Sequence, residues 1–294
     1  MPPVIRPRRS VLFMPGSNAR ALARAKTLFA DALIFDLEDA VAPDTKESAR
    51  QMVCNAVRAG GYGKRELIVR VNSLESVWGE ADLAAVVGCG ADAVLLPKVE
   101  SRDMVQQVLE ILVEHGAPEP LALWCMLETP RGILRAEDIA TSPRVAALVM
   151  GTSDLTKELH ARHTRERLPL LSSLGWCVLV GRANGLTVLD GVHLDLNDDA
   201  GFEYACRQAA DLGFDGKTLI HPKTIAAANR IFAPSHDDVE AARRIIAAHA
   251  EATAQGRGIV VVDGRLIENL HVEEAQRVVA LAEAIAERTA QGSA

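Results

Sequence analysis

The segment Leu121-Ala-Leu-Trp-Cys-Met-Leu-Glu128 decides the fold, because an unbroken apolar run ends on a single carboxylate. An apolar run without polar alternation is typical of a parallel strand that is buried on both faces. Similar runs recur along the chain with helical stretches between them, which predicts repeated strand-helix units. They are Ser10–Pro15, Ala32–Asp36, Glu66–Val71, Ala93–Pro97, Leu121–Leu127, Ala146–Met150, Leu186–Asp190 and Lys217–Ile220.

The stretches between these runs repeat Ala, Leu and Val at helical spacing. They are Ala19–Phe29, Lys46–Gly60, Val77–Gly88, Arg102–Glu114, Leu168–Gly185 and Asp199–Leu212. Eight parallel strands followed by helices describe an α/β protein with a (β/α)8 TIM barrel. The rival, a doubly wound open sheet, usually has a glycine-rich phosphate turn after its first strand, and no G-x-G-x-x-G or Walker sequence occurs here.

We therefore predict a barrel over residues 1–222 and a C-terminal helical extension and lid over residues 223–294. The extension contains two helical patterns, Asp237–Gln255 and Val272–Ala290, with a short strand-like segment, Ile259–Val262, between them. A tail of this length is more than the last barrel helix requires.

Composition excludes several classes of protein. The 294 residues contain 32 Lys and Arg against 39 Asp and Glu, a net charge of −7, which is unsuited to a general nucleic-acid binder. No apolar run is long enough to span a membrane, so no membrane partner is expected. The five cysteines are odd in number and form no C-x-x-C pair, which indicates reduced thiols and a cytoplasmic protein.

The active site of a barrel enzyme lies at the C-terminal ends of its strands, where polar residues follow most of the apolar runs here. They are Ser17, Asn18, Asp36, Glu38, Asp39, Arg70, Asn72, Lys98, Glu128, Ser153, Asp154, Asp190 and His221. Glu128 and Asp154 follow adjacent strands, and two neighbouring carboxylates repel one another unless a cation lies between them. Two oxygen ligands with open positions suit Mg²⁺ or Mn²⁺.

Arg70 ends another apolar strand, where a buried guanidinium needs an anion. Its planar fork matches a substrate carboxylate, and a structural ion pair with Asp36 or Glu38 is the alternative. Asp36 directly closes its apolar run, so we expect it to point into the barrel and to belong to the catalytic set. His221, which precedes a proline, fits a capping role as well as a catalytic one.

Several of these segments together resemble the citrate lyase β-subunit-like members of the HpcH/HpaI aldolase superfamily, which include malyl-CoA, citramalyl-CoA and citryl-CoA lyases. The matching segments are Arg9–Gly16, Phe35–Val41, Arg70–Asn72, Leu96–Glu100, Glu128–Gly132, Gly151–Leu155, Gly213–Lys217 and Ile220–Pro222. They run in order through most of the chain, and their combination is highly specific.

The resemblance implies Mg²⁺ bound by Glu128 and Asp154, and an oxo-acid carboxylate bound by Arg70. It also implies a homotrimer or hexamer in which the lid of one subunit supplies an acidic residue to its neighbour. Glu268 stands at that position, where members often carry Asp. Further contacts implied are Gly151 and Thr152 for the substrate, and Pro15, Gly16 and Lys98 for CoA. Other basic candidates for the CoA phosphates are Arg9, Arg20, Arg24 and Lys26.

The activity implied is a Mg²⁺-dependent acyl-CoA lyase that cleaves or forms a 3-hydroxyacyl-CoA, with acetyl-CoA and a 2-oxo acid as products or substrates. Malyl-CoA thioesterase or malate synthase-type activity remains open, because the same metal and arginine serve both. A CoA-independent class II pyruvate aldolase is a further alternative, but that branch places a histidine beside the acidic cluster, and Asp36–Ala40 contains none. A barrel without catalysis is disfavoured because the acid pair and Arg70 are all present.

Overall fold

The computed structural model describes residues 5–256 and 259–292. The chain divides into two compact units, residues 8–229 and the residues outside that range, and each unit is described by itself. Residues 1–4 of the predicted barrel lie outside the described residues, as do residues 257–258 and 293–294 of the predicted extension.

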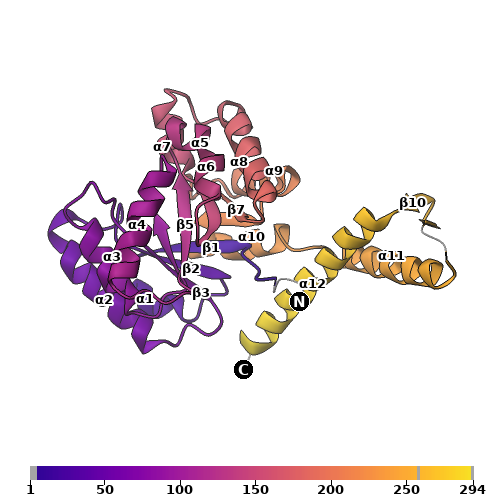
Figure 1. Cartoon of the computed structure of the whole chain (residues 1–294), viewed down its shortest axis with the longest axis horizontal. Coiled ribbons are helices and arrows are strands. Elements are labelled where there is room, and N and C mark those ends of the chain that lie inside the picture. The colour runs from indigo at the N-terminus through magenta and orange to yellow at the C-terminus, as the bar shows by residue number, and fades with distance from the viewer. Residues whose placement is uncertain (1–4, 257–258, 293–294) are drawn as a thin grey trace. The chain divides into compact units, whose positions relative to one another are not determined.

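The first unit contains a closed barrel of eight parallel strands, which confirms the predicted TIM barrel (Figure 1). Each strand pairs with the next along the chain, and β8 pairs with β1 to close the sheet. The strands are β1 Ser10–Pro15, β2 Ala32–Asp36, β3 Glu66–Arg70, β4 Ala93–Leu96, β5 Ala122–Leu127, β6 Val145–Met150, β7 Thr187–Asp190 and β8 Gly216–Leu219.

Helices fill the connections between the strands, and one more helix follows β8. They are α1 Ala19–Ala25, α2 Lys46–Ala59, α3 Gly79–Val87, α4 Arg102–Glu114, α5 Pro130–Leu134, α6 Ala136–Ala140, α7 Thr152–Glu158, α8 Leu171–Ala183, α9 Asp199–Leu212 and α10 Ile225–Ile231. Single 3-10 turns lie at Pro43–Thr45, Leu168–Leu170 and Pro222–Thr224. Helices α5, α6, α7 and α10 were missed by the sequence analysis, since five to seven residues offer few positions in which to see an apolar periodicity.

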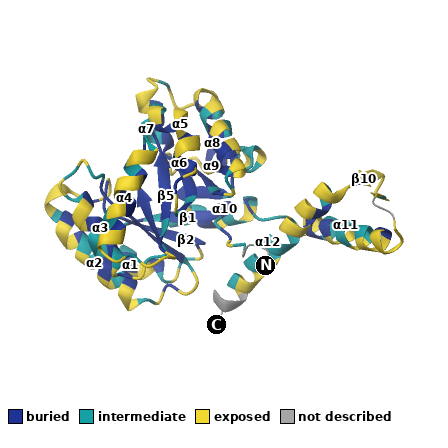
Figure 2. Cartoon of the chain, viewed as in Figure 1, coloured by how far each residue is buried: buried dark blue, intermediate teal, exposed yellow. Residues whose placement is uncertain are grey.

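The barrel interior is filled by alternate residues of the strands, and the strands are accordingly dark blue in Figure 2. Ile34 of β2, Ile68 of β3 and Met126 of β5 belong to this core. Successive side chains of a strand alternate between its two faces, so the residue two positions later points inward as well. This alternation directs Asp36, Arg70 and Glu128 into the C-terminal end of the barrel.

All five cysteines are buried and form no disulfide. In the described part of the chain, no helix combines the length and the apolar character needed to cross a membrane.

The second unit contains a long helical hairpin, α11 His236–Ala254 packed against α12 Asn269–Gly292. The strands β9 Val260–Val262 and β10 Arg265–Ile267 pair antiparallel between the two helices. Ile267 is buried, whereas the cross-strand pair Val261 and Leu266 is exposed. Glu268 directly follows β10 and is exposed.

Candidate active site

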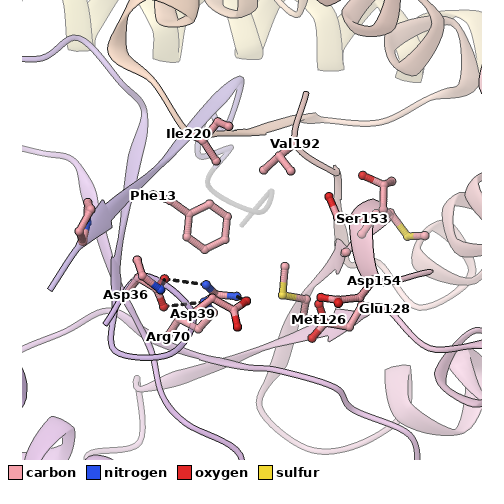
Figure 3. Close-up of a pocket in the computed structure, with 15 residues that line it drawn as sticks. Phe13, Asp36, Asp39, Arg70, Met126, Glu128, Ser153, Asp154, Val192 and Ile220 are labelled. Atoms are coloured by element: carbon pink, nitrogen blue, oxygen red, sulfur yellow. Dashed lines mark hydrogen bonds and ion pairs between the residues drawn. The ribbon is translucent and has the colours of Figure 1, made fainter. Parts of the chain in front are cut away.

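A cavity of about 360 Å³ opens at the C-terminal ends of the barrel strands (Figure 3). It is lined by Phe13, Pro15, Asp36, Asp39, Ala40, Arg70, Met126, Glu128, Met150, Gly151, Thr152, Ser153, Asp154, Val192 and Ile220. Figure 3 shows Asp36, Asp39 and Arg70 on one side of the cavity and Glu128 with Asp154 on the other. The structure therefore brings the two predicted groups of charged residues to one pocket.

Arg70 is held by three carboxylates. Asp36 binds it bidentately, with Oδ1 2.7 Å from Nε and Oδ2 2.6 Å from Nη2. Nη1 lies 2.8 Å from Glu38 Oε2 and 3.2 Å from Asp39 Oδ2. Burial alone would lower the pKa of Arg70, but these carboxylates raise it. The ion pair with Asp36 or Glu38, considered as an alternative from the sequence, is thus present with both residues.

Asp36 has no oxygen left for proton transfer. Besides Arg70, its Oδ1 accepts a hydrogen bond from the Glu38 N–H at 2.9 Å, and its Oδ2 accepts one from the Ala40 N–H at 3.0 Å. Asp36 is only 1% exposed, and it lines the cavity beside Arg70. Its geometry is that of a group that orients Arg70.

Glu38 connects Arg70 to a lysine. Its Oε1 accepts a hydrogen bond from Lys98 Nζ at 2.7 Å. Burial raises the pKa of Glu38, and the nearby Arg70 and Lys98 only partly offset that effect. The backbone beneath Glu38 is fixed by Lys46, whose buried ammonium donates to the carbonyls of Leu37 and Glu38.

Glu128 and Asp154 face the cavity without a basic partner, since neither forms an ion pair with Lys or Arg within the described ranges. Glu128 is 2% exposed, and its Oε1 accepts a hydrogen bond from the Lys98 N–H at 2.8 Å. Burial raises the pKa of Glu128 to about 7, and repulsion from Glu38 and Asp154 adds to it. A cation at this position would relieve both penalties.

The donor set fits Mg²⁺. Among residues 5–256 and 259–292 there is no cluster of three or more His, Cys, Asp or Glu side chains arranged to hold a metal. Mg²⁺ is commonly bound through one or two carboxylates, while water and substrate oxygens complete its coordination. Glu128 and Asp154 supply two such carboxylates beside an open cavity.

Two glycines pack closely against acidic residues of the pocket, Gly151 against the Glu128 side chain and Gly16 against the Asp36 backbone. A Cβ on Gly151 would lie 2.2 Å from the Glu128 Cβ, so only glycine allows β6 to pass the Glu128 side chain this closely. A Cβ on Gly16 would lie 2.5 Å from the Asp36 carbonyl oxygen, which accepts a hydrogen bond from the Gly16 N–H at 2.9 Å. Both glycines predicted at the site therefore pack against a charged residue of the pocket.

Of the other residues predicted to contact the substrate or CoA, some line the cavity and some do not. Pro15 and Thr152 line the cavity. The Lys98 ammonium is committed to Glu38, and Lys26 lies over the Tyr62 ring. Arg9 precedes β1 and pairs with Asp31. It is thus placed at the opposite end of the barrel from the cavity, where no CoA phosphate bound at the mouth would reach it.

Three predicted strand-end residues point away from the cavity. Asp190 is fully buried outside the barrel wall, where it pairs with Lys217 and Arg167. Asn72 donates to the Leu37 carbonyl oxygen. His221 caps a short turn, with Nδ1 accepting from the Lys223 N–H.

Sequence analysis missed the apolar lining of the cavity, which includes Phe13, Met126, Val192 and Ile220. The Arg70 guanidinium carbon lies 4.9 Å from the centre of the Phe13 ring. Phe13 and Met126 could have been found from strand alternation, since each is two residues before a strand-end residue of the site. Val192 lies in a loop and carries no such signal.

Glu268 belongs to the second unit and follows β10 directly. It is exposed, and its backbone N–H donates to His271 Nδ1 at 3.0 Å. Its predicted role in the chemistry stays a prediction.

Comparison with known proteins identifies a family and several similar chains. The profile of the HpcH/HpaI aldolase/citrate lyase family matches residues 9–222. A (3S)-malyl-CoA thioesterase of Cereibacter sphaeroides is 48% identical over 280 residues, which cover 95% of this chain and 96% of the relative. The citrate lyase subunit beta of Escherichia coli is 38% identical over 284 residues, covering 95% and 94% of the two chains.

A solved structure is also similar. The CitE protein of Mycobacterium tuberculosis, in complex with magnesium, acetoacetate and coenzyme A, superposes with a TM-score of 0.77 at 28% identity. The match covers 95% of this chain and 100% of that one. A second CitE structure from the same organism contains oxaloacetate and magnesium and has a TM-score of 0.66 at 30% identity, covering 78% and 98% of the two chains.

Proposed function

Because the chain belongs to the HpcH/HpaI aldolase/citrate lyase family, we propose that it is a Mg²⁺-dependent enzyme acting on a carboxylated 3-hydroxyacyl-CoA. The proposed reaction is cleavage of a citryl-, malyl- or citramalyl-type thioester to acetyl-CoA and a 2-oxo acid, or its reverse. One observation carries the proposal: Arg70 and the acid pair Glu128 and Asp154 face each other across one cavity. An anionic oxo acid and a divalent cation can therefore bind side by side.

Glu128 and Asp154 would hold the Mg²⁺. A Mg²⁺ ion held there would supply Lewis-acid stabilisation of the charge that develops on the oxo acid, a contribution of several kcal/mol. Glu128 is restrained by the Lys98 N–H, so its second oxygen is directed to the cavity with little freedom. A ligand fixed in advance loses little conformational entropy when the cation binds.

Arg70 would bind the substrate carboxylate and orient it. Its Nε and one hydrogen of Nη2 are committed to Asp36, whereas the contact of Nη1 with Asp39 is the longest of the set. Asp39 is also the most exposed of the three acids, with 62% of its side chain accessible. The incoming carboxylate would displace Asp39 from Nη1 while Asp36 holds the guanidinium plane.

An acid/base group is still needed, because in the cleavage direction the 3-hydroxyl loses a proton and the acetyl-CoA enolate carbon gains one. Asp36 is fully committed to hydrogen bonds, so we assign this role to Glu268. It would act from residues 223–294 of a neighbouring subunit, closing as a lid in a homotrimer or hexamer. The exposed apolar pair Val261 and Leu266 beside Glu268 supports docking of that segment onto another surface.

CoA would approach along Pro15 and Gly16 at the rim of the cavity, with Gly151 and Thr152 against the acyl group. The five unbonded cysteines support a cytoplasmic location, since oxidising compartments favour disulfides.

Hydrolysis of the thioester is the second candidate, and the 48% identical malyl-CoA thioesterase favours it. In that reaction water attacks the thioester carbonyl, the carbon–sulfur bond breaks, and the hydroxy acid and free CoA leave. The same carboxylate and cation positions would orient the acyl group for this attack.

One experiment separates the candidates. The protein is incubated with acetyl-CoA and glyoxylate, pyruvate or oxaloacetate, with Mg²⁺ or EDTA, while mass spectrometry follows acyl-CoA products and a thiol reagent follows free CoA. A new Mg²⁺-dependent acyl-CoA without free thiol supports the lyase and identifies its oxo acid. Free CoA released together with the hydroxy acid supports the hydrolase or synthase. No product with any pair contradicts the lyase and the synthase, and hydrolysis is then tested with malyl-CoA itself, where the absence of free CoA contradicts the thioesterase.

A further inference from the structure

Lys98 forms hydrogen bonds with two acidic residues, Glu128, which lines the cavity, and Glu38, which pairs with Arg70. Its backbone N–H donates to Glu128 Oε1 at 2.8 Å, and its side-chain Nζ donates to Glu38 Oε1 at 2.7 Å. The other oxygen of Glu38 lies 2.8 Å from Arg70 Nη1. One backbone hydrogen bond and two ion pairs therefore connect the proposed cation position to the proposed carboxylate position.

The backbone at Lys98 is held in an unusual conformation. Its φ of 49° lies in the left-handed region, which a residue with a long side chain rarely adopts. The turn follows β4 through Pro97, and the next residue, Val99, returns to β5 by donating to the Met126 carbonyl oxygen at 3.2 Å. This turn aims the Lys98 N–H at Glu128. Strained backbone that the surrounding structure maintains is a feature of functional sites.

The side chain balances charge that would otherwise repel an anion. Asp36, Glu38 and Asp39 surround Arg70, so three carboxylates face one guanidinium. The Lys98 ammonium is the second cation on Glu38, whose side chain is only 10% exposed. Without the Lys98 ammonium, Arg70 would be the only cation paired with Glu38. The position proposed for the substrate carboxylate would then carry more negative charge.

We propose that Lys98 is a positioning residue that couples the two binding positions: its N–H fixes Glu128 for the cation, and its ammonium holds Glu38 so that Arg70 can accept a substrate carboxylate. The proposal rests on the function proposed above. It assigns Lys98 to the acid end of the substrate and away from the CoA phosphates. The backbone N–H contact with Glu128 and the side-chain contact with Glu38 are separate, so a substitution can remove the ammonium and leave the N–H in place.

Lys98→Met and Lys98→Gly test the side chain, because both keep the backbone N–H and glycine tolerates the left-handed turn. Mn²⁺ binding is measured by electron paramagnetic resonance, and binding of glyoxylate, pyruvate or oxaloacetate in the presence of Mg²⁺ is measured by calorimetry. Both variants should weaken oxo-acid binding about tenfold, the effect of losing a charged hydrogen bond. Mn²⁺ affinity should stay equal or increase, since the cavity becomes more negative. Lys98→Arg should restore oxo-acid affinity to within about threefold, because it keeps the charge.

A positioning role predicts weaker oxo-acid binding with equal or tighter Mn²⁺ binding. A general structural role predicts that both affinities weaken together. Parallel loss of Mn²⁺ and oxo acid in Lys98→Met therefore overturns the proposal. Unchanged oxo-acid binding, with a raised KM for the CoA thioester but not for the matching pantetheine thioester, also overturns it and assigns Lys98 to the CoA phosphates. If the wild-type protein binds neither Mn²⁺ nor any oxo acid, the proposed function itself fails.

Discussion

Two groups of charged residues lie on opposite sides of the barrel wall and differ in how they are paired. Outside the wall, Asp190 accepts from Lys217 Nζ at 2.6 Å and from Arg167 Nη1 at 2.7 Å, and all three side chains are largely inaccessible. Inside, at the mouth, Glu128 and Asp154 lack a basic partner in the part of the chain that the structure describes and face a cavity.

This difference separates a stabilising role from a binding role. A buried charge is costly unless it is paired and hydrogen-bonded, and the outer group satisfies that condition within itself. The mouth pair does not, so its repulsion is retained in the folded protein until a cation binds. Substitutions should therefore act oppositely on the two groups: activity suffers at the mouth, and folding suffers outside.

The largest effect is expected at the mouth. Glu128→Gln and Asp154→Asn should each lower Mg²⁺-dependent turnover about 10³-fold, because the charge that holds the cation is lost. The melting temperature should stay equal or rise, since a repulsion is removed. Turnover and thermal unfolding are measured together, with Glu100→Gln as the control, because Glu100 pairs with Arg131 at 3.5 Å. Retained turnover in both variants would contradict the assignment of Glu128 and Asp154 as Mg²⁺ ligands.

Substitution of Asp190 in the outer group should lower the stability of the fold. Asp190→Asn leaves Lys217 and Arg167 without their carboxylate, which should cost about 3–5 kcal/mol of unfolding free energy in urea titrations. Turnover per folded molecule should remain near the wild-type value. A variant that is equally stable but inactive would show that Asp190 acts at the cavity after all.

The stability contributed by the Asp190 carboxylate should depend on pH. Burial alone would raise the pKa of Asp190, but Lys217 and Arg167 outweigh it and lower the pKa below the usual 3.8. Its contribution to stability is therefore complete above that value and is lost as the pH falls through the lower folded-state pKa. Wild-type stability should decline more steeply than that of Asp190→Asn below about pH 4. Parallel curves would contradict the ion-pair account.

Sequence reasoning predicted the barrel and its inward-pointing acids because both follow from strand pattern. Arg70 and Glu128 each end an apolar strand two residues after a core side chain, so their direction was readable. Asp190 also ends a strand, but it directly follows the core residue Leu189 and so faces outward. Applying the alternation would have excluded it. The left-handed turn at Lys98 depends on where the loop returns to β5, which a strand pattern does not encode.

A smaller loss of rate is expected from the second unit. Glu268→Gln should lower kcat about 10²-fold with little change in KM, if this carboxylate transfers the proton. Glu273→Gln is the matched control, since it removes an exposed carboxylate from the same unit. Steady-state kinetics of both variants decide the point. An unchanged kcat for Glu268→Gln would place the acid/base group on another residue.

The smallest effect is expected at Asp39, which lies on the Arg70 side of the cavity. Its contact with Arg70 at 3.2 Å is exposed and competes with an incoming carboxylate. Because exposed ion pairs contribute at most about 1 kcal/mol, Asp39→Asn should tighten oxo-acid binding about two- to fivefold in calorimetry. Weaker binding in this variant would mean that Asp39 contacts the substrate directly. Tighter binding would show that Arg70 exchanges a protein carboxylate for that of the substrate, whereas Asp190 keeps its partners throughout.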